Sequence, residues 1–183
     1  MDPAALEILQ TGERTLLRHP VPADAPAFLA MVEASRALHH PWVHPPGDAA
    51  AFGRFVEHAA TERLQGFLIC LRDTGEIAGV ATLSEIVRGL FWSTYLGFYA
   101  SAAWAGRGFL KEGLGLVLRH AFGPLGLHRV EANVQPENTR SLALVRSLGF
   151  QKEGFSPKYL RIGGQWRDHE RWAMLAETWE GGS

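Results

Sequence analysis

A glycine-punctuated turn at residues 104–110, Trp-Ala-Gly-Arg-Gly-Phe-Leu, holds the residues of this chain best suited to bind an anion. It lies between a strand-like run at residues 93–99 and a helix-like run at residues 109–122. Two glycines let the backbone approach a ligand closely, and the amides that open a helix present the positive end of its dipole. The pattern therefore predicts a site for a phosphate or pyrophosphate group.

Two common phosphate-binding motifs do not fit this turn. The dinucleotide fingerprint needs a third glycine three positions after the second, and Lys111 stands there. A P-loop needs a lysine directly after a glycine, and none of Lys111, Lys152 and Lys158 has that position. Taken alone, the turn is equally compatible with a plain helix start, so its ligand must be inferred from the rest of the chain.

The bulk properties predict one globular domain over residues 1–183, with a core at about residues 15–179. The 183 residues are 46% hydrophobic and 20% charged, which is ordinary for a folded domain. A formal net charge of -1 without a basic block argues against direct nucleic-acid binding. The chain shows no signal peptide, no apolar run of the ~20 residues that cross a bilayer, and one cysteine, Cys70, in an apolar run. We expect a cytoplasmic protein without membrane contact, as a monomer or homodimer.

Hydrophobic periodicity predicts a mixed α/β architecture. Asp24 and Asp48 are each suited to cap a helix, with a proline-rich loop at residues 41–46 between the two helices. Later helices are expected at residues 109–122 and 138–149, and strands at residues 15–18, 67–71, 77–87, 93–99, 129–134, from residue 150 onward through 158–162, and 166–174. Antiparallel strands leading into one strand-helix-strand unit place the turn at the carboxyl end of a strand, where ligands usually bind.

Several short motifs together resemble one family, the GNAT acetyltransferases, and within it the Rim-type ribosomal-protein alanine N-acetyltransferases of the RimJ branch. In chain order the motifs are Pro41-Trp42, Val87-Arg88-Gly89, Tyr95-Leu96-Gly97, Trp104 with Gly106-Arg107-Gly108, Glu112, His128-Arg129, Gly149-Phe150, Lys152-Glu153-Gly154, Tyr159-Leu160 and residues 164–169. The resemblance implies a single-domain GNAT fold, a mostly antiparallel mixed sheet flanked by helices with a V-shaped opening at the coenzyme A turn. It further implies acetyl-coenzyme A as cosubstrate, no metal, and a protein N-terminal amine, such as that of a ribosomal protein, as acceptor.

The resemblance also implies roles for individual residues. Backbone amides of the turn would hold the coenzyme pyrophosphate; the turn residues are Ala105, Gly106, Arg107, Gly108, Phe109 and Leu110. The strand edge at Phe98, Tyr99 and Ala100 would pair with the amides of the pantetheine arm, and Asn138 would contact the same arm. Ala105 and Leu110 depart from the side chains of the family pattern, but backbone amides bind irrespective of them. Ser141 would hydrogen-bond the coenzyme sulfur and protonate the departing thiolate. As purely structural residues, Asn138 would be an N-cap and Ser141 a first-turn serine bonded to a backbone carbonyl.

Acyl transfer to an amine also needs a proton acceptor. An α-amine with a pKa near 7.8 is roughly one-tenth neutral at pH 7, so a carboxylate or a histidine suffices as base. We favour Glu85, on the strand beside the expected acceptor groove, although it is equally compatible with a solvated position on that strand; Asp168, His169 and His128 are the alternatives. The expected acceptor contacts are Trp42, Glu85 and Tyr159.

Three other groups of residues are interpreted structurally. His39, His40 and His44 lack further ligands and predict a polar loop rather than a metal site. Val145 stands where many acetyltransferases outside the RimJ branch carry a tyrosine acid, so that mechanism is not expected here. The remaining tryptophans are taken as packing residues: Trp92, Trp104, Trp166, Trp172 and Trp179.

Three functions follow as hypotheses. The first is an N-acetyltransferase that moves the acetyl group of acetyl-coenzyme A to a protein N-terminal α-amine by direct attack in a ternary complex. The second keeps the reaction but takes a small amine as acceptor, such as an aminoglycoside, a dipeptide or a polyamine. The third is a non-catalytic acyl-coenzyme A-binding module, which Ser141→Ala would distinguish because it has no turnover to lose.

Overall fold

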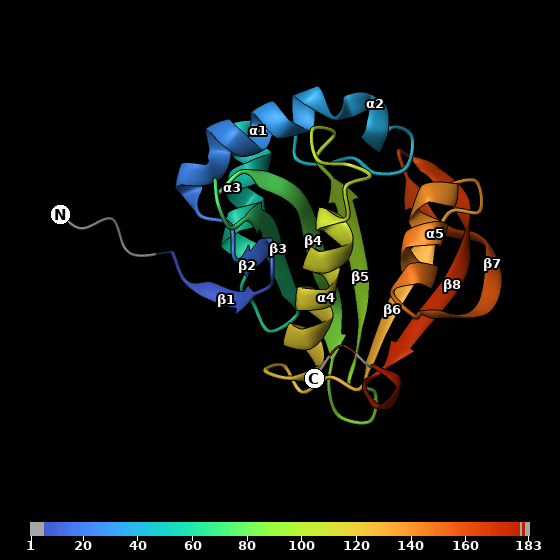
Figure 1. Ribbon diagram of the computed structural model, residues 1–183. Coiled ribbons are helices and arrows are strands. Elements are labelled where there is room, and N and C mark those ends of the chain that lie inside the picture. Colours follow the sequence, from blue (N-terminus) through green and yellow to red (C-terminus); the bar gives the residue numbers. More distant parts are fainter. Residues whose placement is uncertain (1–5, 180, 182–183) are drawn as a thin grey trace.

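The computed structural model describes residues 6–179 and 181, and within them eight strands form one mixed sheet (Figure 1). The sheet order is β1-β2-β3-β4-β5-β6-β8-β7, and neighbouring strands are antiparallel except for the parallel pair β5 and β6. The strands are β1 (Ile8–Thr11), β2 (Thr15–Arg18), β3 (Leu64–Leu71), β4 (Ile77–Val87), β5 (Ser93–Ala100), β6 (Arg129–Val134), β7 (Gln151–Ile162) and β8 (Gln165–Leu175). The predicted meander that leads into a strand-helix-strand unit is confirmed.

Helices cover both faces of this sheet (Figure 1). One face carries α1 (Ala25–Ala34) and α3 (Ala49–His58), and the other carries α4 (Phe109–Phe122) and α5 (Thr139–Ser147). The short helix α2 (Arg36–His39) follows α1, and two 3-10 turns complete the description, η1 (Pro22–Asp24) and η2 (Ala176–Thr178).

Alternation along the central strands builds two apolar clusters. On β3, Phe67 and Ile69 belong to the cluster under α4 and α5, whereas Leu68 and Cys70 belong to the cluster under α1 and α3. Successive side chains of a strand point to opposite faces, so a strand covered on both sides reads as a continuous apolar run. Cys70, in the apolar run noted in the sequence, is 1% exposed, and burial raises the pKa of its thiol.

The sheet opens between its two parallel strands. β5 pairs with β6 only at residues 93–95, opposite residues 129–131, while on its other edge β5 stays paired with β4 as far as Ala100. Beyond Tyr95 the two strands diverge, with the start of α4 and the start of α5 on either side of the gap (Figure 1). This is the V-shaped opening that the family resemblance implies.

The structure departs from the sequence-based expectations in several places. β1 and α2 were not predicted, whereas the strand expected from residue 150 onward is confirmed as β7. The Asp48 cap is confirmed by a 2.8 Å bond from the Ala51 amide, but the Asp24 carboxylate makes no cap bond to α1; it binds the Val21 amide and Arg18 instead. A packing role is wrong for Trp166, which is 61% exposed. No helix among the described residues is long and apolar enough to cross a membrane.

Candidate active site

The turn before α4 has the backbone conformation that its glycines predict. Gly106 and Gly108 have φ angles of 75° and 84°, in the left-handed region that L side chains rarely adopt. Gly108 is the N-cap of α4 and brings no side chain to the cap, so the first amides of the helix stay unpaired by it. A turn of this shape ends in a row of backbone donors at the positive end of a fourteen-residue helix.

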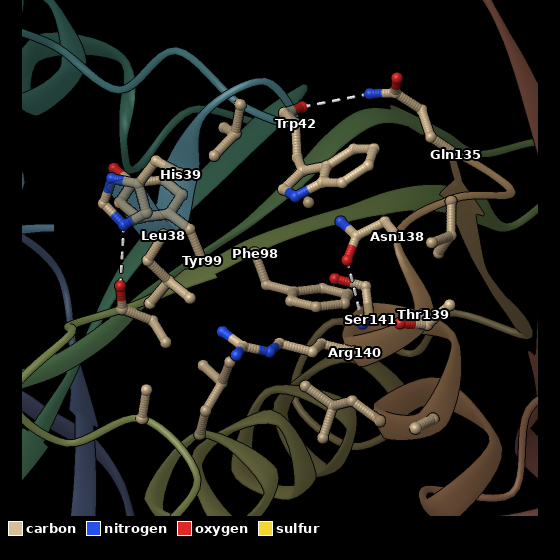
Figure 2. A pocket seen from close by; sticks show the side chains of 18 of the residues that line it. Leu38, His39, Trp42, Phe98, Tyr99, Gln135, Asn138, Thr139, Arg140 and Ser141 are labelled. Carbon is tan, nitrogen blue, oxygen red and sulfur yellow. Dashed lines mark hydrogen bonds between the residues drawn. The ribbon is translucent and has the colours of Figure 1, made fainter. Parts of the chain in front are cut away.

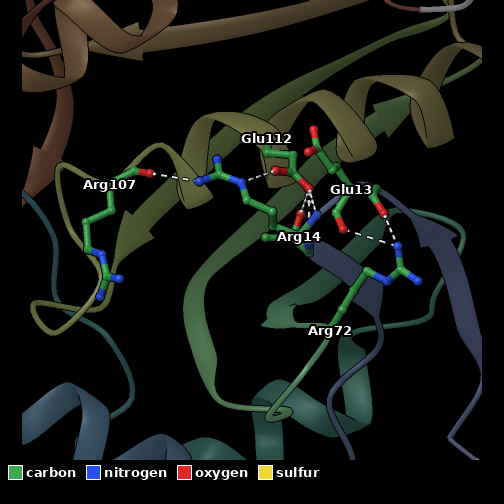
Figure 3. A network of polar contacts seen from close by, with 7 residues as sticks. Glu13, Arg14, Arg72, Arg107 and Glu112 are labelled. Carbon is green, nitrogen blue, oxygen red and sulfur yellow. Dashed lines mark hydrogen bonds and ion pairs between the residues drawn. The ribbon is translucent and has the colours of Figure 1, made fainter.

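A carboxylate at the first turn of α4 fixes this helix against β2 (Figure 3). Glu112 Oε1 accepts from the Arg14 amide at 2.7 Å, the Thr15 amide at 2.9 Å and the Thr15 hydroxyl at 2.9 Å, while Oε2 accepts from Arg14 Nε at 3.0 Å. Arg14 also donates to the Arg107 carbonyl at 3.3 Å. Burial acts to raise the pKa of Glu112, but the hydrogen bonds from Arg14 and Thr15 outweigh it and the net pKa is lowered.

The side chains of the turn stack on one another. The Trp104 and Phe109 rings meet edge to face at 5.5 Å, and the Arg107 guanidinium lies over both rings, 4.6 Å from the first centroid and 5.4 Å from the second. Arg107 and Phe109 therefore hold the outside of the turn rather than lining the cavity beside it. Their predicted part in binding the coenzyme rests on their backbone amides.

A cavity of about 1050 Å³ fills the opening between β5 and β6. It brings together most of the residues predicted to contact the coenzyme, from the turn, the β5 edge and α5: Phe98, Tyr99, Ala100, Ala105, Gly106, Gly108, Leu110, Asn138 and Ser141. Burial raises the pKa of the Tyr99 phenol, which keeps it protonated at neutral pH. A cavity of this size exceeds what a compact small ligand needs and suits an extended one.

Asn138 and Ser141 lie side by side at the start of α5 (Figure 2). Asn138 Oδ1 accepts from the Ser141 amide at 3.2 Å, so the structural reading of Asn138 as an N-cap is confirmed while its side chain also lines the cavity. Within the described residues the Ser141 hydroxyl bonds no backbone carbonyl, unlike the structural role considered for it. Val145, at the position of the tyrosine acid in other branches, is fully buried.

The proline-rich loop reaches across to the start of α5 (Figure 2). The Trp42 carbonyl accepts from Gln135 Nε2 at 3.4 Å, and the Trp42 side chain lines the cavity as predicted for an acceptor contact. A second hollow of about 370 Å³ adjoins it, lined by residues of the loop, the β6–α5 connection and β8: Pro41, Trp42, Gln135, Glu137, Trp166, Arg167 and Asp168.

Besides Arg107 and Phe109, two residues predicted to act on the acceptor do not line the cavity, Glu85 and Tyr159. Glu85 has a φ of 49° at an irregular point of β4, where its exposed carboxylate pairs with Arg63 at 2.5 Å. Tyr159, on β7, has its ring 6.3 Å from that of His169, the residue that lines the cavity beside it. The strand register places neither side chain on the cavity wall. The geometry therefore argues against direct contact between Glu85 and an acceptor bound in the cavity.

The cavity residues missed in the sequence include His39 and Gln135. His39 is 4% exposed, not part of a polar loop, and its Nε2 lies 2.8 Å from the Ala100 carbonyl (Figure 2). Gln135 follows β6 and is also buried. The sequence offered one signal for His39 and Gln135: both lie next to predicted helices or strands, in connecting segments where functional side chains concentrate. In the described part of the chain, no three histidine, cysteine or acidic side chains gather where a metal ion could bind.

These features fit a ligand with a pyrophosphate at one end and an extended arm. The turn offers amides with no side chain in the way, since a Cβ on Gly106 would meet nothing within 4 Å. The β5 edge past Tyr95 has lost its strand partner and leaves backbone groups for the amides of such an arm.

Comparison with known proteins points to a family whose members bind such a ligand, coenzyme A. An acetyltransferase (GNAT) domain model matches residues 14–151. The chain is 34% identical over 180 residues to the ribosomal protein uS5-alanine N-acetyltransferase of Escherichia coli (strain K12), across 94% of this chain and 93% of that protein. Mycobacterium smegmatis RimJ in complex with a coenzyme A disulfide is 30% identical with a TM-score of 0.81, covering 89% of this chain and 82% of that one.

A more distant structure bounds what the fold can tell. A chimera of the Vibrio cholerae spermidine N-acetyltransferase SpeG superimposes with a TM-score of 0.77 at 20% identity, over 91% of this chain and 98% of that one, a likeness of fold alone. The fold thus leaves the acceptor open. The matching domain model, the curated relative and the solved structures agree on the reaction class, and the chain belongs to the GNAT acetyltransferase family as an acetyl-coenzyme A-dependent N-acyltransferase.

Proposed function

We propose that this enzyme acetylates the α-amine of a protein N-terminus, on a ribosomal protein that begins with alanine or serine. Support comes from the 34% identity, over nearly the full length of both chains, to an enzyme that acts on the alanine of ribosomal protein uS5. The predicted coenzyme contacts and the cytoplasmic location belong to the same proposal.

One observation carries the acceptor assignment. The large cavity, which Ser141 lines, and the smaller hollow at β8 share Trp42, Gln135 and Glu137, so the two spaces adjoin at the loop. A single amino group does not need the second space, whereas a polypeptide whose first residue reaches Ser141 must place its following residues somewhere. Trp42 and Trp166 offer aromatic surfaces for them there.

In this reaction the chain mainly positions two substrates. The turn and the free β5 edge hold the donor, and the acceptor amine enters from the Trp42 side, so that the neutral amine can attack the thioester carbon directly. The Ser141 hydroxyl makes no bond to a backbone group in the described part of the chain, so it is available to the sulfur as the carbon–sulfur bond breaks. An α-amine favours such a site because about one-tenth of it is already neutral at pH 7.

The proposal is tested by thiol release from acetyl-coenzyme A with a panel of acceptors. The panel holds short peptides starting with alanine, serine or proline, the same peptides with blocked N-termini, and spermidine and an aminoglycoside. We expect release with the free alanine and serine peptides, and none with the blocked ones. Release with the small amines alone would contradict the proposal and favour the second acceptor class.

Replacing the serine tests the catalytic assignment. Ser141→Ala should lower kcat with the preferred peptide about 100-fold, because the leaving thiolate loses its proton donor, while the Kd of coenzyme A stays within about threefold. Ser147→Ala on the same helix is the control, since its hydroxyl is already used by the Leu144 carbonyl at 2.8 Å. Equal kcat for wild type and Ser141→Ala would remove Ser141 from the mechanism.

A further inference from the structure

The proton released by the acceptor amine needs a destination, and the structure separates the four candidate bases. Glu85 is exposed, ion-paired with Arg63 and outside the cavity. His128 is also exposed and outside it, with its Nε2 2.9 Å from Glu177. Neither group lines the cavity that Ser141 lines, so neither is placed to take a proton from an amine held there.

The other two candidates are neighbours on β8 with different surroundings. Asp168 lines only the smaller hollow, is exposed, and accepts from the Lys158 amide at 2.8 Å. His169 lines the large cavity, in common with Ser141, and is 3% exposed. Adjacent residues of a strand face opposite ways, so only one of the two can face the cavity from this strand.

The hydrogen bonding of His169 fixes which ring nitrogen is basic. Nδ1 lies 3.0 Å from the carbonyl oxygen of Arg167, which can only accept, so Nδ1 carries the proton and Nε2 keeps the lone pair. Within the described residues Nε2 has no hydrogen-bond partner, and it is not fully buried. Nε2 is therefore the ring nitrogen that opens to the cavity.

The other cavity histidine has the opposite arrangement. His39 Nε2 donates to the Ala100 carbonyl at 2.8 Å, which leaves the lone pair on Nδ1. That Nδ1 is fully buried without a partner in the described residues, so no ligand in the cavity reaches it. Of the two histidines on the cavity wall, only His169 presents a basic nitrogen to the space.

We propose that His169 is the general base of the transfer, an inference that rests on the N-terminal acetyltransferase function proposed above. The amine nitrogen forms the new carbon–nitrogen bond and the carbon–sulfur bond breaks. One amine proton passes to His169 Nε2, and the Ser141 proton passes to the leaving sulfur. Water then returns the proton from Nε2 to Ser141, so the products are an amide and a thiol and both residues are restored.

The surroundings keep this imidazole neutral. Burial lowers the pKa of His169 from its ordinary value of 6.5, while the hydrogen bond to Arg167 and the charge of Asp168 act against that shift without reversing it. From β7 it faces the edge of the Tyr159 ring at 6.3 Å. The other titratable or charged groups on the cavity wall are His39, Tyr99, Lys111, Glu137 and Arg140.

The experiment is the pH dependence of kcat/KM for the preferred peptide, in wild type and His169→Gln. Below the amine pKa of about 7.8, log(kcat/KM) rises with slope one, because one proton must leave the acceptor. A general base with a lower pKa must also lose its proton before it can act. Below that pKa the wild-type slope of log(kcat/KM) should therefore steepen to two. His169→Gln should keep slope one throughout and lose about 100-fold in kcat/KM at pH 7.

A buried histidine outside the cavity provides the matched control. His120, on α4, is 7% exposed, also has a pKa lowered by burial, and packs edge-on against Phe67 at 5.5 Å. His120→Gln should retain the break to slope two, whatever it does to stability. For His169→Gln, a coenzyme A Kd within about twofold of wild type shows that the cavity has formed.

The outcomes separate this inference from the function on which it rests. If wild type turns over no peptide, the proposed function fails, and the same comparison of slopes is made with the amine that is turned over. If peptides are turned over and His169→Gln keeps the wild-type slopes, His169 is not the base. If His169→Gln has also lost coenzyme A binding, His169 has a structural role instead, and the inference is likewise overturned.

Discussion

The two ends of the cavity are built in different ways. The end proposed to bind the donor, here the donor end, consists of backbone: the turn glycines, the first amides of α4 and the unpaired edge of β5. The end proposed to bind the acceptor, here the acceptor end, consists of side chains, Trp42 from a loop, Gln135 from the β6–α5 connection and His169 from β8. Ser141 lies in the same cavity as both.

This difference explains which sequence changes each end tolerates. Ala105 and Leu110 depart from the family pattern at the donor end, yet the turn retains its shape because Gly106 and Gly108 adopt φ angles of 75° and 84°. What the donor end requires is a conformation, and hence glycine. The acceptor end has no backbone motif, so its specificity depends on the identity of a few side chains.

The donor end should be broken by adding one methyl group to the turn. Gly106→Ala puts a Cβ on a residue with a φ of 75° and no neighbour within 4 Å, so its effect is backbone strain rather than a clash. We expect the Kd of coenzyme A, measured by calorimetry, to rise about tenfold because the turn relaxes away from the bound conformation.

A second glycine isolates strain from binding. Gly75, in the β3–β4 turn, has the same φ of 75°, and a Cβ added to it would likewise meet no atom within 4 Å. Gly75→Ala should cost a similar free energy of unfolding, about 1 kcal/mol, and leave the Kd unchanged. If both variants weakened coenzyme binding alike, the turn would matter only through overall stability.

The acceptor end should respond to Trp42. Trp42→Ala removes an aromatic wall shared by the cavity and the hollow, and we expect the KM for the preferred peptide to rise about fivefold with the coenzyme Kd nearly unchanged. Steady-state kinetics with saturating donor measures this. The control is Trp92→Ala, because Trp92 is 38% exposed and lines neither space. A larger effect on the coenzyme Kd than on the peptide KM would place Trp42 at the donor end.

The fold was predictable where the signal is local and repeated. Helix α4 was predicted with its observed bounds, Phe109–Phe122, since successive turns of apolar spacing define it. Strand β1 and helix α2 have four residues each and were missed, whereas β2, of the same length, was predicted, so an element this short shows too little of a period to be identified dependably. The exposed Trp166 shows the same limit, because an alternating strand does not say which of its faces is covered.

The candidate site divides along the same line. The turn before α4 could be predicted because its conformation depends on two glycines close together in the chain. Glu85 was preferred to His169 as base because of its place along a predicted strand. Which of the two side chains reaches the cavity depends instead on the irregular pairing of β4 and on the pairing of β8 with β6 and β7. His39 was assigned to a polar loop because its partner, the Ala100 carbonyl, is 61 residues away. Such contacts exist only once the sheet has formed.

The smallest expected effect concerns Glu112, which fixes the donor end to β2 without lining the cavity (Figure 3). Glu112→Gln keeps one acceptor oxygen but loses the charge, so we expect a loss of about 1 kcal/mol in the free energy of unfolding at pH 7 and little change in coenzyme Kd. The net pKa of Glu112 is lowered in the fold. Its charge therefore stabilises the fold above the unfolded pKa of about 4.3, and this contribution disappears as pH falls through the folded pKa.

The stability difference between wild type and Glu112→Gln should accordingly be largest near neutral pH and shrink below about pH 4. Denaturant titrations at several pH values measure it. Glu13→Gln is the control, since this neighbouring exposed carboxylate makes no hydrogen bond within the described residues and only the Glu13 carbonyl is used, by Arg72. A difference that stays constant with pH would mean that the shape of the Glu112 side chain, and not its charge, ties α4 to β2. The donor end would then depend on packing as much as the acceptor end does, and the contrast between the two would weaken.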